Sequence, residues 1–329
     1  MAMLISSGAF ASDGVAPVYA EGRYQNPWGT NINKNLWSLL KWKLAGGAQE
    51  WPKKVAFEFR ELPAKPQSGA VITWINHATF LIQLPNLNVL IDPVWSERVS
   101  PFSWIGPKRV HTVGLAWEKL PKIDLVLISH NHYDHLDLAT LVGLEKRDAP
   151  QFLVPLGDLA LLSDQGIKRI VEMTWWQEFK LGNVVVTFTP AQHWSSRWSW
   201  DRNKSLWGGW WLQEGQTQLL PAGHTGLRPH FKMIREKLGT PTLVMIPIGA
   251  YEPRWFMKDM HMNPSDAVEA VIDLGTPHQA VAMHFGTFPL SDEGHETPAL
   301  DLKAAIEKRK LTSQFLVPAV GQSFTTNGE

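Results

Sequence analysis

Short runs of apolar residues, separated by turn-forming glycine, proline, asparagine and aspartate, recur along the chain from residue 70 onwards. Runs of this kind are typical of strands that are covered on both faces. They predict strands at 70–75, 79–84, 87–91, 125–128, 152–154, 169–173, 184–189, 206–212, 217–220, 242–246, 279–283 and 314–317. Apolar residues at helical spacing predict helices at 36–44, from 137, and at 157–164, 229–238, 264–274 and 299–310. This order of strands and helices predicts two stacked β-sheets with helices outside.

Several of the predicted strands lead directly to residues that can bind metal ions. The strand at 125–128 runs into a histidine-rich loop, and three later strands lead to His193, His224 and His284. Strand ends that meet along one edge of a sheet assembly form a natural site. A single histidine after a strand is more often a hydrogen-bonded structural residue. Because the pattern repeats, we expect these side chains to converge.

The histidine-rich loop is His130-Asn-His132-Tyr-Asp134-His135. Imidazole and carboxylate suit zinc and other first-row divalent ions, and a loop at the end of a rigid strand can hold such groups in place. The chain has no cysteine, so any metal must be held by histidine, aspartate or glutamate. The alternative is a polar surface loop that is rich in histidine.

Composition and charge narrow the class of protein. The chain has 329 residues, of which 44% are hydrophobic, and this is enough for a proper core. Its 31 basic and 31 acidic residues leave no net charge, so we expect no nucleic-acid partner. No apolar run approaches the ~18 residues of a membrane-spanning helix. We therefore expect a soluble globular protein, cytoplasmic or periplasmic, for which peripheral contact with a membrane stays open.

Residues 1–66 are expected to form an N-terminal extension whose helix packs on a single main domain at 67–329. The segment Ala9-Phe10-Ala11 is similar to a signal-peptidase site, but no basic stretch precedes it. We interpret the start as an ordinary tail or as the remnant of a trimmed signal. The helix at 36–44 has a second interpretation, as a short amphipathic helix that contacts a lipid surface through its tryptophans.

The sequence around the loop resembles a known family. His130-Asn-His132-Tyr-Asp134-His135 is similar to the His-x-His-x-Asp-His signature of the metallo-β-lactamase superfamily. Over about residues 25 to 320 the chain is similar to one branch, the N-acylphosphatidylethanolamine-hydrolysing phospholipase D group. The phrases that carry this likeness are Gly106-Pro-Lys-Arg109, Gln192-His-Trp194, Pro247-Ile-Gly-Ala-Tyr-Glu-Pro-Arg-Trp-Phe-Met257 and His284-Phe-Gly-Thr-Phe288.

The resemblance implies a four-layer αββα sandwich of two mixed β-sheets with a metal site at its edge. One or two Zn²⁺ ions are expected, with Mn, Fe or Ni as alternatives. By position, one ion would be held by His130, His132 and His193, and the other by Asp134, His135 and His284. In the family a bridging aspartate stands where this chain has His224. A neutral imidazole offers one nitrogen to one metal, so either the second ion binds more weakly or His224 is a terminal ligand.

Other polar residues are assigned by their position relative to the ligands. His77 and Asp92 are expected behind the ligands, where they would orient the imidazoles; capping of the turn before Pro93 is the alternative for Asp92. The family usually has Gly-His where this chain has Asn76-His77. We expect surface or packing roles for His111, His230, His278 and His295, and His261 is left open.

The implied reaction is hydrolysis of a phosphodiester in a lipid similar to N-acyl phosphatidylethanolamine. A zinc-bound water has a pKa of about 7, and the catalytic residue Asp134 would orient this water and pass its proton to the leaving group. One alternative is another hydrolase of the superfamily, for a lactone, a sugar phosphate or a nucleic-acid phosphodiester. Another is a weakly active metal-binding protein, because His224 replaces the bridging aspartate.

Three residues are candidates for contact with the substrate: Trp194, Tyr251 and Arg254. Arginine can pair with phosphate, and tryptophans suit a lipid interface. The alternative for Arg254 is a structural ion pair. The tryptophans at 207–211 are expected to pack in the core.

Overall fold

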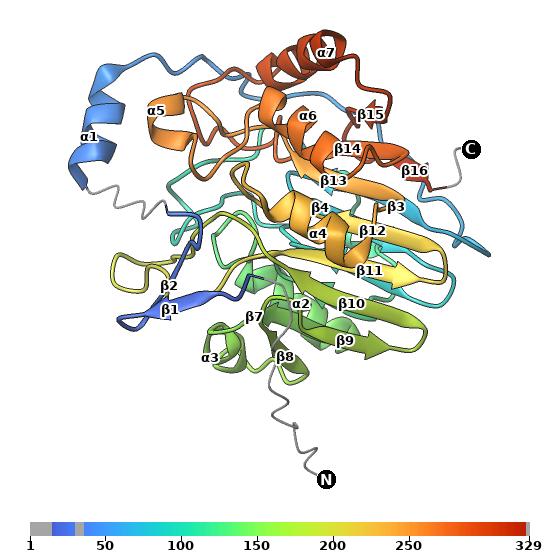
Figure 1. Cartoon of the computed structure of the whole chain (residues 1–329). Helices are drawn as coiled ribbons and strands as arrows, with labels where there is room; N and C mark the ends of the chain where they lie inside the picture. The colour runs from blue at the N-terminus through green and yellow to red at the C-terminus, as the bar shows by residue number, and fades with distance from the viewer. Residues whose placement is uncertain (1–14, 30–35, 327–329) are drawn as a thin grey trace.

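The computed structural model describes residues 15–29 and 36–326, and two stacked β-sheets form its centre (Figure 1). The first sheet has the strand order β16-β3-β4-β5-β6-β7-β8. Its strands are β3 (Val71–Asn76), β4 (Thr79–Gln83), β5 (Asn88–Ile91), β6 (Leu125–Leu127), β7 (Gln151–Pro155), β8 (Ile170–Met173) and β16 (Ser323–Thr325). In this sheet β16, β3, β4 and β5 pair antiparallel, and β5 to β8 pair parallel.

The second sheet repeats this arrangement with the order β15-β14-β13-β12-β11-β10-β9. Its strands are β9 (Glu178–Leu181), β10 (Val184–Thr189), β11 (Gly209–Glu214), β12 (Thr217–Pro221), β13 (Leu243–Pro247), β14 (Gln279–Met283) and β15 (Gln314–Leu316). Strands β9 to β12 pair antiparallel and β12 to β15 pair parallel. A separate ribbon consists of β1 (Val18–Ala20) and β2 (Arg23–Gln25).

Parallel strands need a crossover connection, and here most of these connections contain a helix. On the first sheet these helices are α2 (Leu138–Asp148) and α3 (Leu159–Ser163), and on the second α4 (His230–Leu238), α6 (Pro264–Asp273) and α7 (Thr297–Arg309). The remaining helices are α1 (Leu36–Ala45), η1 (Trp117–Lys119) and α5 (Arg254–Met257). Helices cover the outer face of each sheet (Figure 1), and the predicted αββα sandwich is confirmed.

Three apolar clusters hold the layers together. The largest lies between the sheets and includes Phe80, Phe188 and Trp210, which are fully buried. A second cluster joins the outer face of the second sheet to α4, α6 and α7, and a third joins the first sheet to α2 and α3. Because both faces of each sheet are covered, the strands consist of nearly unbroken apolar runs, which is the pattern that identified them in the sequence.

The predicted strand at 206–212 is wrong in its first part, because β11 begins at Gly209. Residues 206–208 instead reach the first sheet: Leu206 N donates to Leu156 O (2.8 Å) and Gly208 N donates to Ser129 O (3.0 Å). A side chain at 208 would lie 2.4 Å from Thr189 O, so the close approach needs glycine there. Strands β1, β2, β9 and β16 and helix α5 were not predicted.

Helix α1 confirms the predicted helix, and it contacts the rest of the chain through Trp42 and through Lys41, whose Nζ lies 5.4 Å from the centre of the Trp255 ring. Trp42 is buried; its indole Nε1 donates to Asp292 Oδ2 (2.7 Å) and its ring lies 4.9 Å from that of Phe256. Trp37 and Leu44 on the same helix are 77% and 84% exposed. The helix therefore packs on the domain and also presents apolar side chains to solvent. Among the described residues, no helix has the length and apolar character needed to cross a membrane.

Candidate metal centre

The histidine-rich loop lies between a buried strand and the first turn of a helix. It follows β6, which pairs with β5 on one side and β7 on the other. At its far end Asp137 is the N-cap of α2, as predicted, and its carboxylate accepts from Ala139 N (3.2 Å). The same carboxylate also accepts from Ser96 N (2.9 Å). The loop is thus held at both ends by regular structure.

The first group of potential ligands combines the loop with the end of β10. His130 Nε2 lies 2.9 Å from His132 Nδ1, and His193 Nε2 lies 3.3 Å from the same nitrogen. His193 Nδ1 donates to Met260 O (3.1 Å), which leaves Nε2 as the ligating nitrogen. The three predicted ligands of one ion therefore present one nitrogen each to a common point, from both sheets.

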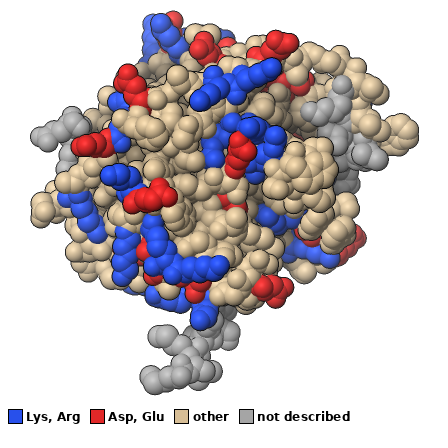
Figure 2. All heavy atoms as spheres, turned by 180° about the vertical axis from the view of Figure 1, so that it is seen from behind, with Lys and Arg blue, Asp and Glu red and all other residues tan. Residues whose placement is uncertain are grey.

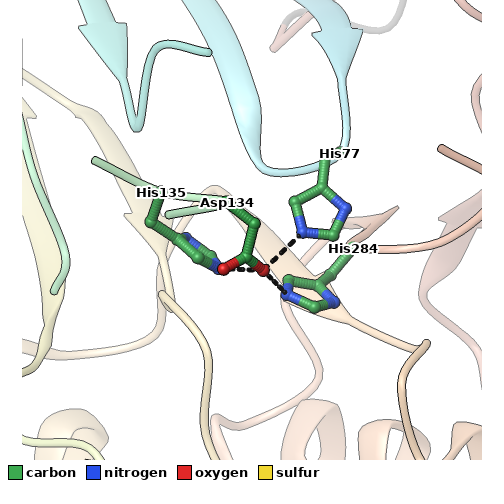
Figure 3. Close-up of side chains that lie close together, drawn as sticks. All are labelled: His77, Asp134, His135 and His284. Atoms are coloured by element: carbon green, nitrogen blue, oxygen red, sulfur yellow. Dashed lines mark hydrogen bonds and ion pairs between the residues drawn. The ribbon is translucent and has the colours of Figure 1, made fainter. Parts of the chain in front are cut away.

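The second group surrounds Asp134 (Figure 3). Asp134 Oδ2 lies 3.0 Å from His77 Nε2, 3.2 Å from His284 Nε2 and 3.4 Å from His135 Nε2. Three of these residues were predicted as ligands of the second ion. His77 was predicted behind the ligands, yet its nitrogen is close enough to the others to bind the same ion. It follows β3, and its ring centroid lies 3.8 Å from that of His284, with the two rings tilted by 47°.

Strained backbone positions some of these groups. His77, Asp92 and His284 have φ values of 45°, 41° and 60°, in the left-handed region, where a side chain costs of order 1–3 kcal/mol. Asp92 accepts from His135 Nδ1 (2.7 Å) and from Ser129 N (2.7 Å). Asp92 therefore contacts the nitrogen of His135 that points away from Asp134, and this contact fixes which nitrogen of that ring faces Asp134.

His224 lies between the two groups. Its ring centroid is 3.6 Å from that of His284, 4.7 Å from that of His193 and 5.7 Å from that of His135. It follows β12 and is buried, and its Nε2 has no hydrogen-bond partner among the described residues. A buried imidazole nitrogen without a partner is costly, and binding of a metal ion removes that cost.

The charges of the centre suit metal binding. Burial, and to a smaller extent neighbouring imidazoles, hold the pKa values of four histidines well below the ordinary range: His130, His193, His224 and His284. Burial also lowers the pKa of His132, to about 3. These rings are neutral, which is the form that binds metal. Burial alone would raise the pKa of Asp134, but the charge of His135 and hydrogen bonds from His135, His284 and His77 keep it well below its usual range. His135 is the exception: carboxylates Asp134 and Asp92 outweigh burial and raise its pKa to about 9, so this ring must release a proton when it binds a metal.

The donor set therefore fits a borderline divalent ion. The ligating atoms are imidazole nitrogens and one carboxylate, a combination that suits zinc and its neighbours in the first transition row better than calcium or magnesium. The structure supports a metal-binding role for the clusters, and the identity of the metal stays a prediction.

A second layer of polar contacts, which the sequence did not reveal, lies beneath the loop. Asn131 Nδ2 donates to Asp158 Oδ1 (3.0 Å), and Asp158 is 1% exposed. Arg197 Nη1 donates to Asn131 O (3.0 Å) and Leu136 O (2.8 Å), and its guanidinium lies 3.9 Å from the centre of the Tyr133 ring. Arg197 thus connects the loop at 194–205 to the loop that carries the ligands. No local pattern marks these contacts, because they join distant segments.

The three predicted substrate contacts lie in different surroundings. Trp194 is next to the centre, with its ring 4.2 Å from that of His132. Tyr251 is 3% exposed and donates from its hydroxyl to Asp301 Oδ2 (2.5 Å), so its polar atom already has a partner. Arg254 forms an ion pair with Asp266 (2.6 Å). For Tyr251 and Arg254 the structure therefore favours structural roles, and for Arg254 this is the alternative stated above.

The other histidines separate into two kinds. His111, His230 and His295 have packing contacts: His111 Nε2 lies 3.1 Å from Thr287 Oγ1, and His295 Nε2 donates to a backbone carbonyl. His278 is exposed. His261 is different, because one nitrogen of its ring lies within 4.8 Å of a nitrogen of His193 and of a nitrogen of His224.

The tryptophans fall into a buried set and an exposed set. Trp207, Trp210 and Trp211 pack in the core, as predicted, whereas Trp198 and Trp200 are 43% and 62% exposed, and their rings stack with centroids 5.3 Å apart.

Comparison with known proteins adds independent information. The sequence model of a family described as a beta-lactamase superfamily domain matches residues 87–285. The chain is 38% identical over 257 residues to N-acyl-phosphatidylethanolamine-hydrolyzing phospholipase D 1 of Caenorhabditis elegans, covering 74% of this chain and 72% of that protein. It is 30% identical over 257 residues to a protein of Methanopyrus kandleri named as a metal-dependent hydrolase, covering 77% of this chain and 98% of the other.

Among solved structures, a metallo hydrolase from the archaeon Ignicoccus hospitalis has a similar fold. The TM-score is 0.61 at 23% sequence identity, and the alignment covers 78% of this chain and 98% of the other. At this level of identity the likeness concerns the fold alone.

Proposed function

The chain belongs to the β-lactamase superfamily and is a metal-dependent hydrolase with the metallo-β-lactamase fold, and from this we propose that it cleaves a phosphodiester of the phospholipase D type in N-acyl phosphatidylethanolamine-like lipids. The observation that carries the proposal is the convergence of two ligand groups on neighbouring points at the ends of strands from both sheets. The relative from Caenorhabditis elegans, whose name specifies this lipid, supports the substrate class.

The proposed roles of the residues follow from their contacts. His130, His132 and His193 would hold one ion, and Asp134, His135 and His284, with His77 close by, would hold the other. When bound, such ions supply a Lewis acid for the phosphoryl oxygens and lower the pKa of water to about 7. Asp134, whose carboxylate is ionised before the reaction, would orient the attacking water and take up its proton as the water attacks phosphorus. Cleavage breaks the bond between phosphorus and the N-acylethanolamine oxygen, and Asp134 would return the proton to that oxygen.

A lipid surface as the partner is supported by the exposed aromatic side chains. Trp198 and Trp200 belong to the loop at 194–205, which Arg197 ties to the ligand loop. Trp37 and Leu44 of α1 and Trp255 of α5 are also exposed, and α1 and α5 lie at the same edge of the molecule (Figure 1). Amphipathic tryptophans favour the interface between lipid and water. We therefore propose peripheral contact with a membrane through these groups.

Charge is expected to contribute little to this contact. The chain has no net charge, and Figure 2 shows one face on which basic side chains lie among acidic ones. Vesicle binding should therefore depend on the tryptophans and change little between low and high salt. Replacement of Trp198 and Trp200 by serine should weaken sedimentation with phospholipid vesicles, whereas Leu300→Ser, at a 65% exposed site on α7, serves as the control. Equal sedimentation of all three proteins would contradict the contact through this loop.

The direct test of the reaction uses zinc-loaded protein and N-acyl phosphatidylethanolamine in mixed vesicles. Release of N-acylethanolamine and phosphatidic acid, measured by mass spectrometry, is expected for the wild type and for His278→Gln but not for Asp134→Asn. An aryl phosphodiester and a lactone are assayed beside it. If the same preparation opens the lactone and leaves both phosphodiesters intact, the phosphodiesterase proposal is wrong.

The position of His224 supports a second candidate function, a metal-binding protein with little hydrolytic activity. A neutral imidazole at the centre of the cluster brings no negative charge to offset two divalent ions. Activity and metal content of His224→Asp distinguish the candidates. If the wild-type protein is already an active hydrolase, the second candidate is excluded. If hydrolytic activity arises only in His224→Asp, the second candidate is supported.

A further inference from the structure

His193, His224 and His261 form a cluster of imidazoles on one side of the centre. The ring centroids of His224 and His261 are 4.2 Å apart, those of His193 and His224 4.7 Å, and those of His193 and His261 5.5 Å. One nitrogen from each ring lies within 4.8 Å of one nitrogen from each of the others. This spacing leaves room for one ion to bind all three nitrogens after small side-chain rotations.

Two hydrogen bonds to backbone carbonyls hold these three histidines in their relative positions. Met262 N donates to Thr225 O (3.1 Å), which joins the residue after His261 to the residue after His224. His193 Nδ1 donates to the carbonyl of Met260 (3.1 Å), the residue before His261. The cluster is therefore fixed by its neighbours in sequence and does not depend on an ion to bring its segments together.

A glycine allows the close approach of these segments. A Cβ atom at Gly226 would lie 2.3 Å from Asp259 O, so only glycine lets the chain after His224 pass so near the segment that carries His261. From the other side, Arg254 Nη1 donates to His261 O (2.9 Å), while Arg254 Nη2 pairs with Asp266 (2.6 Å). The ion pair thus orients the Arg254 side chain, and the hydrogen bond from its Nη1 holds the backbone carbonyl of His261.

We propose that His193, His224 and His261 are a metal-binding triad of their own, which takes a borderline divalent ion such as Zn²⁺ or Co²⁺ and exists because residue 224 is histidine. An aspartate at 224 would place its oxygens nearer the main chain, whereas the imidazole of His224 reaches the ring of His261. Three imidazoles with one open position form a common donor set for zinc. The buried Nε2 of His224, which has no hydrogen-bond partner among the described residues, is consistent with a role as a ligand.

The triad competes with the group formed by His130 and His132, because His193 belongs to both and its Nε2 can bind only one ion. The ion on this side of the centre therefore has two alternative positions. The proposal concerns the metal alone, and it holds whichever substrate the protein cleaves.

The test is a cobalt titration of metal-free full-length protein in four forms: wild type, His261→Gln, His224→Asp and the double variant. Co²⁺ bound by nitrogen ligands has visible d–d absorption, and each ligating imidazole adds a hyperfine-shifted N–H signal to the proton NMR spectrum. In the wild-type background, His261→Gln should weaken binding of one cobalt equivalent at least about ten-fold, as loss of supporting contacts alone commonly does, and should remove one shifted N–H signal. In the His224→Asp background the same change should alter the affinity less than about two-fold. His278→Gln, at an exposed site, is the matched control.

Two results would overturn the triad. One is unchanged cobalt affinity and NMR spectrum in His261→Gln. The other is an equal loss of affinity in both backgrounds, which would mean that His261 acts independently of His224. Circular dichroism of each metal-free variant checks its folding, and His261→Asn replaces any glutamine variant that does not fold. Because no lipid is present in the titration, failure of the phosphodiesterase assay and failure of the triad are separate outcomes.

Discussion

Asp158 offers the sharpest prediction about stability, because it is a buried carboxyl under the ligand loop. It is 1% exposed, and burial raises its pKa to about 7 despite hydrogen bonds from Ser205 and Asn131 that act in the opposite direction. Its Oδ2 has no hydrogen-bond partner among the described residues. The change to test is Asp158→Asn, which keeps an oxygen for Asn131 and cannot ionise.

The raised pKa of Asp158 determines whether stability rises or falls with pH. A carboxyl whose pKa is higher in the folded state contributes its full stability below the unfolded pKa of 3.8 and loses it as the pH rises through about 7. Each pH unit between the two values is worth about 1.4 kcal/mol. Ionisation of Asp158 should therefore lower the free energy of unfolding by about 4 kcal/mol in total, and about 3 kcal/mol of this loss occurs between pH 5 and pH 8. In that interval the wild type should lose this much stability relative to Asp158→Asn.

Urea unfolding of the metal-free proteins, followed by tryptophan fluorescence at several pH values, measures the difference. Asp164→Asn, at an exposed position just after α3, is the control and should follow the wild type at every pH. The other titrating groups, including His135, are shared by all three proteins and cancel in the comparison. The reasoning is refuted if the difference in free energy of unfolding between the wild type and Asp158→Asn stays constant within about 0.5 kcal/mol from pH 5 to pH 8. Asp158 would then not be ionising in a buried site.

Further predictions concern the metal, the ion pair and the core. Removal of metal with a chelator should lower the melting temperature and zinc should restore it, because an ion that binds only the folded state stabilises it; an unchanged melting temperature in scanning calorimetry would contradict metal binding. His224→Asp should retain a second ion more tightly than the wild type, measured as zinc per chain after gel filtration. Arg254→Met removes the ion pair with Asp266 and the hydrogen bond to His261 O, and should cost about 2 kcal/mol in urea unfolding. Leu127→Ala, in the fully buried β6, should cost about 2–5 kcal/mol, and a loss below 1 kcal/mol would contradict its packing between the layers.

Much of the fold could be predicted from local pattern. The strands that lie between layers are apolar along their whole length, so they were found, and the ends that lead to His193, His224 and His284 followed from them. The half-exposed β9 and the short β1, β2 and β16 were missed because their apolar signal is weak. The start of β11 was misplaced because Leu206 and Trp207 are as apolar as residues of a buried strand. Their backbone groups instead form hydrogen bonds with residues that follow strands of the first sheet.

By itself, the sequence determined the type of protein: apolar runs dictated two covered sheets, and a histidine-rich loop after a buried strand, in a chain without cysteine, indicated nitrogen and carboxylate ligands. Only the tertiary structure decided which side chains lie together. It placed His77 beside Asp134, put His261 next to His224, and gave Arg254 and Tyr251 carboxylate partners. The reason is physical: periodicity and spacing record the surroundings of a residue along its own strand or helix, whereas distances between sheets depend on how the layers pack.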